Sequence, residues 1–157
     1  MKNQFVPYEI ALALKELGFN EKCFYAWCQV KSGYTETGGD KWLDEYKMRE
    51  NGNPFGSFEE GRNWNDIKGS NKNRIQCSSP LYQQVIDWFR EKHQIYIRIN
   101  MYRDDDAIDE IDQTLWDVTL IDKEWNDTSD YTYYHSYEEA RDAAILEAIK
   151  IVKGENK

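Results

Sequence analysis

The sequence predicts an α+β fold: an antiparallel sheet of three to five strands, three helices packed largely on one face, and a long irregular insertion at residues 32–77. Three observations predict it. Three segments carry apolar residues at helical spacing, two neighbouring segments alternate strictly, and a polar, glycine-punctuated stretch separates the first strand from the second helix. The length fits a single domain, residues 1–157, because a chain of about 150 residues buries roughly 68–70% of its extended surface.

The first helix is expected to begin at Pro7 and to end before Gly18. Ile10, Leu14 and Leu17 then share one face. Charged residues interrupt this apolar run, so it is too short for a signal peptide and far too short for a membrane span of about 20 residues. We therefore expect a helix that docks on the core of a cytoplasmic protein.

Residues 23–30 are aromatic and β-branched enough to form a strand. The polar stretch at 32–77 is too long for an ordinary connection. It is also rich in aromatic residues, including Trp42 and Trp64, whereas disordered segments are poor in them. We expect an ordered, irregular insertion with one short helix near residues 41–49.

The other two helices have clear start signals. Ser79 can cap the second helix and Pro80 can open it, and apolar residues at helical spacing continue to residue 89. Ser136 can cap the last helix, with Glu139 three residues on to complete a capping box. An apolar stripe follows through residues 140–152.

Two alternating runs, residues 95–103 and 114–121, predict neighbouring antiparallel strands, and residues 131–135 are expected to add a short third. In the first run, one face carries Ile95, Ile97, Ile99 and Met101. The opposite face carries Tyr96, Arg98, Asn100 and Tyr102.

Charge argues against some partners. The formal net charge is −9, and this charge repels both nucleic-acid phosphates and anionic lipid. We therefore expect neither nucleic acid nor a membrane as partner. Aromatic residues make up 15% of the chain, more than a core of this size is expected to enclose together with their polar tips. Some of them should lie on a surface or in a groove.

The residue types that carry catalysis form no recognised motif. Cys23, Cys28 and Cys77 are an odd set, expected as reduced thiols, and a zinc site at the first two would need two further ligands. His93 closes the second helix, where a cation suits the helix dipole, and neither it nor His135 has a nucleophile motif nearby. We predict no catalytic residue, no metal and no cofactor, and favour a protein that is not an enzyme.

The acidic stretch at residues 104–112 holds six carboxylates within nine positions. Carboxylates suit a hard cation such as Ca²⁺, but the regular ligand spacing and the turn glycine of a calcium loop are absent. We interpret the stretch as a solvated hairpin loop. An alternative is that the acids mimic a phosphate backbone and occupy a basic groove on a partner.

Three segments, "FVPYEIALALKELGF", "SSPLYQQVIDWFREKH" and "SYEEARDAAILEAIKIV", occur here in this order. In these segments the chain resembles a family of small uncharacterised proteins from Bacteroidota genomes and their phages. The likeness covers about a third of the residues, and residues 31–76 lie outside it. The family has no established activity, so the resemblance implies a cytoplasmic, phage-borne accessory protein and no site residues.

The site expectation concerns the sheet face that carries Tyr96 and Arg98. It is joined by either the Asp117/Thr119 face or the Trp116/Val118 face of the next strand, and Arg98 can pair with Asp117. Such a face is either an ordinary solvated surface or a recognition surface, since Tyr, Trp and Arg dominate binding hot spots. The candidate binding residues are Tyr96, Arg98, Asn100, Tyr102, Asp117, Trp42 and Trp64.

These residues favour a non-enzymatic binding protein, a phage accessory or anti-defence factor that engages a host protein through an aromatic and acidic surface. The alternative is a small-molecule-binding protein or enzyme whose pocket lies between the sheet and the insertion at 32–77. In that alternative, the aromatic residues of the insertion form a lid.

Overall fold

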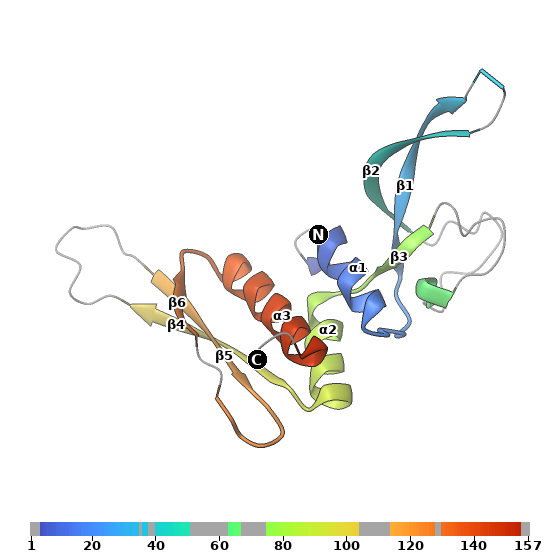
Figure 1. Cartoon of the computed structure of the whole chain (residues 1–157). Coiled ribbons are helices and arrows are strands. Elements are labelled where there is room, and N and C mark those ends of the chain that lie inside the picture. Colours follow the sequence, from blue (N-terminus) through green and yellow to red (C-terminus); the bar gives the residue numbers. More distant parts are fainter. Residues whose placement is uncertain are drawn as a thin grey trace. The chain divides into compact units, whose positions relative to one another are not determined.

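The chain has an α+β fold made of two compact units, Met1–Tyr82 and Gln83–Lys157, in the computed structural model shown in Figure 1. The structure describes residues 4–34, 36–37, 40–50, 63–66, 75–103, 114–127 and 130–154. Each unit carries its own three-stranded antiparallel sheet. The strands therefore form two sheets, where the sequence suggested one, and the expectation of a single domain stays a prediction.

The N-terminal unit contains α1 (Tyr8–Glu16), β1 (Tyr25–Tyr34), β2 (Asp40–Glu50), the 3₁₀ turn η2 (Trp64–Asp66) and β3 (Ile75–Ser79). Its sheet has the order β2-β1-β3, and α1 packs against β3. The predicted first helix is confirmed: Ile10, Ala11 and Leu14 are buried, and Gly18 ends the helix in the left-handed region at a φ of 89°.

The expectation of a short helix near residues 41–49 is wrong, because Asp40–Glu50 forms the strand β2. It pairs with β1 from Tyr25 opposite Glu50 to Tyr34 opposite Asp40. Trp42, Tyr46 and Met48 lie four and two positions apart, which fits the period of two of a strand. The charged residues between them obscured this pattern. The stretch at 32–77 thus contains the end of β1, all of β2 and most of β3.

The 3₁₀ turn η2 is tied to the sheet by hydrogen bonds from two consecutive residues. The Trp64 backbone N–H donates to Ser78 Oγ at 3.1 Å, and its indole Nε1 donates to the carbonyl of Cys23 at 2.9 Å. Asn65 donates through Nδ2 to the carbonyl of Phe19 at 2.6 Å, and its Oδ1 accepts from the Ser78 N–H at 2.9 Å. These bonds satisfy buried polar groups around Cys23 and Ser78.

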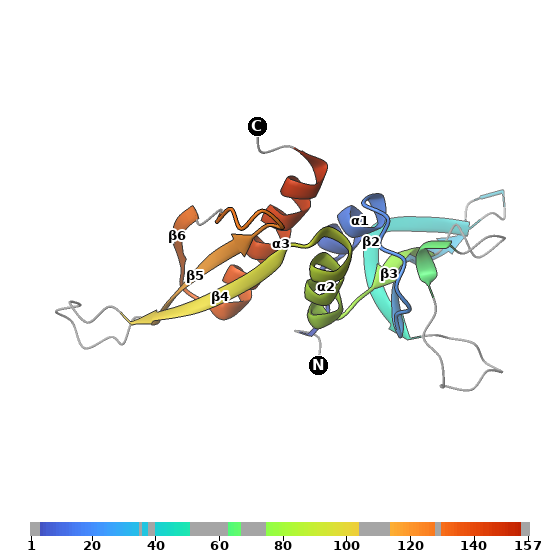
Figure 2. The same cartoon turned by 90° about the horizontal axis from the view of Figure 1, so that it is seen from below.

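The C-terminal unit contains nearly all of α2 (Tyr82–Trp88), the π-helical turn η3 (Phe89–His93), β4 (Tyr96–Arg103), β5 (Thr114–Ile121), β6 (Asp130–Tyr134) and α3 (Tyr137–Lys153). Its sheet has the order β4-β5-β6. The helix α3 packs against all three strands, as Figure 2 shows. The predicted meander of three antiparallel strands is confirmed.

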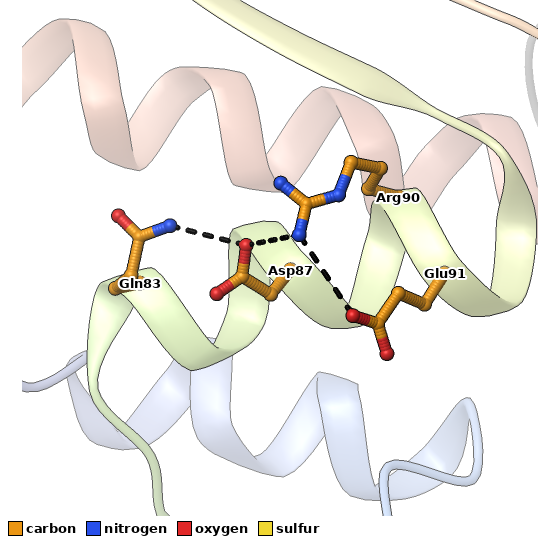
Figure 3. Close-up of polar contacts among 4 residues, drawn as sticks. All are labelled: Gln83, Asp87, Arg90 and Glu91. Atoms are coloured by element: carbon orange, nitrogen blue, oxygen red, sulfur yellow. Dashed lines mark hydrogen bonds and ion pairs between the residues drawn. The ribbon is translucent and has the colours of Figure 1, made fainter.

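The second predicted helix is present as α2 continued by η3, and Gln94 ends it with a positive φ of 56°. Its predicted start is wrong: the helix begins at Tyr82, because Ser79 belongs to β3 and pairs with Tyr25. A chain of polar contacts runs along its outer surface (Figure 3). Asp87 Oδ1 accepts from Gln83 Nε2 at 3.1 Å and pairs with Arg90 Nη2 at 2.7 Å, and Arg90 also lies 3.8 Å from Glu91. These groups are exposed, so the pairs contribute little to stability.

The predicted cap of the last helix is confirmed for Ser136, whereas the reciprocal bond from the Ser136 N–H to the Glu139 side chain does not form. Ser136 Oγ accepts the Glu139 N–H at 3.2 Å, and Gly154 ends the helix with a φ of 71°. The buried stripe of α3 consists of Ala140, Ala144, Ile145, Ala148 and Ile149.

We predict that Ser136→Ala lowers the free energy of unfolding by about 1 kcal/mol, because the substitution leaves an N–H of the first turn without its side-chain acceptor. Urea denaturation followed by far-ultraviolet circular dichroism measures this change. Ser136→Asp restores an acceptor and serves as the matched control. A Ser136→Ala variant as stable as the wild type would show that the cap does not contribute.

Candidate functional site

The sheet of the C-terminal unit has one covered and one uncovered face. On the covered face, Val118 and Leu120 are buried and the ring of Trp116 lies 5.3 Å from that of Tyr137 on α3. The residues of the opposite face are exposed or half-buried, and none of the nine residues named next is buried. We call it the tyrosine face, and its residues are Tyr96, Arg98, Asn100, Tyr102, Leu115, Asp117, Thr119, Ile121 and Tyr133.

The register between β4 and β5 settles which residues share this face. Asn100 lies opposite Asp117, and Arg98 lies opposite Thr119. Side chains of directly opposed residues in an antiparallel pair project to the same side. The Asp117/Thr119 alternative is therefore the one that joins the tyrosine face, and Trp116 and Val118 belong to the covered face.

Three tyrosines stand out from this face. Tyr96, Tyr102 and Tyr133 are 48%, 54% and 50% exposed, respectively. The rings of Tyr102 and Tyr133 meet edge to face with their centroids 6.0 Å apart, across the intervening strand β5. Tyr133 was not predicted from the sequence. Its place on this face follows from the register of β6: Tyr134 pairs with Trp116 on the covered face, and its neighbour must then point the other way.

The polar centre of the face differs from the expected pair. Asn100 Nδ2 donates to Asp117 Oδ1 at 2.6 Å and lies 3.4 Å from Thr119 Oγ1. Asp117 is thus held by Asn100, and the expected contact between Arg98 and Asp117 does not form. Arg98 is exposed, and its guanidinium makes no ion pair with the other residues that the structure describes.

This arrangement suits recognition better than covalent chemistry. Half-exposed phenol rings offer apolar area and a polar tip at a small cost in conformational entropy, and a free guanidinium offers a planar fork of donors. A rigid sheet holds these groups in place. Among the described residues, no cluster of three or more His, Cys, Asp or Glu side chains could hold a metal ion.

The net charge of the chain is confined to this unit. The C-terminal unit holds 18 acidic and 9 basic residues, whereas the N-terminal unit holds 11 of each. The tyrosine face itself carries one exposed cation, Arg98, in a unit of net charge −9. The acidic stretch at 104–112 contributes to this charge, and its predicted loop conformation lies outside the described residues.

The two tryptophans named as candidates lie in the other unit. Trp42 is in β2, opposite Lys31 of β1, and its side chain lies outside the described part. Trp64 is only 8% exposed, and its indole N–H already donates to a backbone carbonyl. It serves as a core residue here, and a ligand contact for either tryptophan stays a prediction.

The cysteines and histidines occupy structural environments. Cys23, Cys28 and Cys77 are free and buried, and burial raises the pKa of Cys23 and of Cys77 to about 12. The His93 ring packs 4.5 Å from that of Trp88, and burial lowers the pKa of this histidine. His135 is exposed. Thiols held in the protonated form are poor nucleophiles and poor metal ligands.

Trp125 is the most exposed of the large apolar side chains in the described part of the chain, and it was not predicted from the sequence. Trp125 lies in the turn between β5 and β6, is 80% exposed and has a positive φ of 63°. Asp122 Oδ1 accepts the backbone N–H groups of Glu124 and Asn126 at 2.8 and 2.9 Å and so fixes the turn. The hydrogen bond from Asn126 Nδ2 to Asp122 Oδ2 lowers the pKa of Asp122, and the two backbone N–H groups lower it further. The run of Asp and Asn around Trp125 was the available signal.

No family model matches the chain, and no curated protein or solved structure shows significant similarity to it. No helix in the described part of the chain is both long enough and apolar enough to cross a membrane.

We predict that the thiols resist modification in the folded protein. Burial holds Cys23 and Cys77 near a pKa of about 12, so at pH 8 Ellman's reagent should react slowly with the native chain and fully with the urea-unfolded chain. Rapid reaction of two or more thiols in the native protein would contradict this.

The same raised pKa values predict how stability depends on pH. The folded state keeps these thiols protonated, so their contribution is fully present below the unfolded pKa of 9.0 and is lost as the pH rises toward about 12. Above pH 9 each thiol should reduce the unfolding free energy by up to about 1.4 kcal/mol per pH unit. Urea titrations of wild type and Cys77→Ala check this, because the variant should show a shallower slope.

Proposed function

We propose that the C-terminal unit binds a protein partner through the tyrosine face. The observation that carries the proposal is the one-sided packing of the sheet, which leaves Tyr96, Tyr102 and Tyr133 half-exposed around Arg98, a side chain that forms no ion pair with any residue in the described part of the chain. Tyr and Arg are enriched at the centres of protein interfaces because their side chains bury a large area and keep a polar group available.

Charge indicates the chemistry of such a partner. A unit with a net charge of −9 attracts a basic surface and repels an acidic one over a distance of about 8–10 Å at physiological salt. Arg98 is the local exception on the tyrosine face. Its guanidinium needs an acceptor, so we expect the partner to carry a carboxylate or a carbonyl group at the centre of an otherwise basic contact surface.

We further propose that the protein acts in the cytoplasm of a bacterial host as a phage accessory or anti-defence factor. This rests on the resemblance of three segments to small proteins of Bacteroidota and their phages. Binding a host protein is a common mode of action for small phage proteins, and the proposal needs no catalytic group. Genomic neighbours in a prophage or a defence island would support it, and a metabolic operon would argue against it.

The test is a charge reversal at the centre of the tyrosine face. Arg98→Glu should reduce recovery of the partner in a pull-down at least tenfold. The substitution replaces the guanidinium with a carboxylate, which repels the carboxylate or carbonyl group expected opposite it on the partner. Lys92→Glu is the matched control: Lys92 is also exposed and lies in the same unit, and the charge change is identical.

Equal loss with both variants would assign the effect to net charge instead of the tyrosine face. Recovery of the partner by Arg98→Glu at the wild-type level would remove the tyrosine face as the interface. Thermal unfolding of all three proteins verifies that neither substitution disturbs the fold.

A further inference from the structure

The strand β4 forms one edge of the C-terminal sheet. It pairs with β5 along its whole length, from Tyr96 opposite Ile121 to Arg103 opposite Thr114, with no irregularity in the register. No other described strand pairs with its outer side. In an antiparallel ladder, alternate residues direct their backbone N–H and C=O groups away from the neighbouring strand. The outer side of β4 therefore presents a row of backbone donors and acceptors.

This edge lacks most of the features that usually prevent strand pairing. Proteins protect sheet edges with proline, charged side chains (lysine above all), bulges or very short strands. β4 is eight residues long, is regular throughout and has neither proline nor lysine; its charged residues are Arg98 and Arg103. Such an edge accepts a further strand readily.

The sequence of β4 indicates what that further strand is. Tyr96–Tyr102 reads Tyr-Ile-Arg-Ile-Asn-Met-Tyr, which is nearly palindromic about Ile99. Tyrosines lie three positions on either side of the centre, Ile97 and Met101 two positions away, and Arg98 and Asn100 one position away. When two copies of this strand pair antiparallel about Ile99, aromatic residues face aromatic residues and apolar residues face apolar residues. Next to the centre, Arg98 as donor faces Asn100 as acceptor.

We propose that β4 pairs antiparallel with β4 of a second copy of this chain, with Ile99 opposite Ile99 at a two-fold axis. Tyr96 then faces the second copy's Tyr102, and Ile97 faces its Met101. Both kinds of pair, aromatic with aromatic and apolar with apolar, stabilise neighbouring strands. A two-fold symmetric contact of this kind needs the same surface to be complementary to itself, which the palindrome provides.

The polar pair next to the axis supports this register. Asn100 uses its amide nitrogen to hold Asp117 at 2.6 Å, which leaves its carbonyl oxygen to accept from a donor. In the proposed pairing that donor is the guanidinium of Arg98 from the second copy. The carboxylate of Asp117 on the next strand adds a favourable negative charge nearby.

Neighbouring registers fit less well. Opposed residues must belong to the same face, so the centre of symmetry can move only by a whole residue along the strand. A centre at Arg98 sets two guanidinium groups against each other. A centre at Asn100 gives a ladder of the same length, residues 97–103, but it places Ile97 opposite Arg103 and Arg98 opposite Tyr102, so residues of like kind no longer face each other.

The paired assembly joins the two sheets into one of six strands. The α3 helices of both copies lie on one side of it, and the two tyrosine faces form a single surface on the other. The inference rests on the sheet edge and stands independently of the proposed partner, although it would double the surface available to one.

Engineered cysteines test both the pairing and its register. Opposed residues in an antiparallel pair have Cα atoms about 4.5–5.5 Å apart, within reach of a disulfide. Ile99→Cys should therefore form a disulfide-linked dimer under mild oxidation. Tyr96→Cys and Tyr102→Cys should remain largely uncrosslinked when oxidised separately and should crosslink when mixed. The native cysteines give a low background because they are buried.

A second variant tests the edge without altering the tyrosine face. Met101→Lys adds a charge beside the second copy's Ile97, and Met101 is 65% exposed on the opposite face, so folding should be unaffected. Light scattering should show wild-type protein moving from one chain to two over a roughly hundredfold rise in concentration. Met101→Lys should remain a monomer, while Leu146→Lys, at an exposed apolar position on α3, should dimerise like the wild type.

A wild-type protein that stays monomeric throughout this range would overturn the inference. So would a dimer in which residue 99 crosslinks no faster than residues 96 or 102 oxidised alone. Because Met101→Lys leaves Arg98 and the tyrosines in place, loss of the dimer with retention of a protein partner would separate this inference from the proposed function.

Discussion

The C-terminal unit depends on the packing of α3 against one face of a three-stranded sheet. The buried stripe of α3 contains three alanines, Ala140, Ala144 and Ala148, which let the helix axis come close to the strands. Val118 and Leu120 fill the space beneath it. A single helix on a three-stranded sheet buries one face only, and the alternation of the strands then places Tyr96, Arg98 and Tyr102 outside.

The two units differ in how they use aromatic residues and charge. In the N-terminal unit, Trp64 is buried and hydrogen bonded, and acidic and basic residues balance. In the C-terminal unit, tyrosines and Trp125 are exposed and the charge is strongly negative. Because of this contrast, we propose that the C-terminal unit carries the recognition surface, and we assign a structural role to Trp64.

The sequence predicts those features that depend on local spacing. The capped helix at Tyr137–Lys153 and the alternating strands β4 and β5 are confirmed, because caps and periodicity act within a few residues. Pairing between distant segments is not visible at that scale. The pairing of β1 with β3, about 50 residues apart, is of this kind. The pairing of β2 with β1 was missed for a different reason: only residues 35–39 separate the two strands, but charged residues obscure the alternation of β2.

The candidate site was predicted in part for the same reason. The tyrosines of β4 and Arg98 follow from alternation, whereas the partner of Asp117 depends on a register that a shift of two residues would change. Tyr133 required knowledge of how β6 joins the sheet. Trp64 was named from its residue type, and its burial follows from hydrogen bonds to residues far away in the sequence.

Recognition through the tyrosine face requires this face to be open to solvent in the folded protein. Limited nitration with tetranitromethane, followed by peptide mass spectrometry, measures this directly. Tyr96, Tyr102 and Tyr133 should be nitrated well before Tyr82, which is only 7% exposed. Protection of all three tyrosines to the level of Tyr82 would show that this face is covered in the folded chain, and would contradict the account.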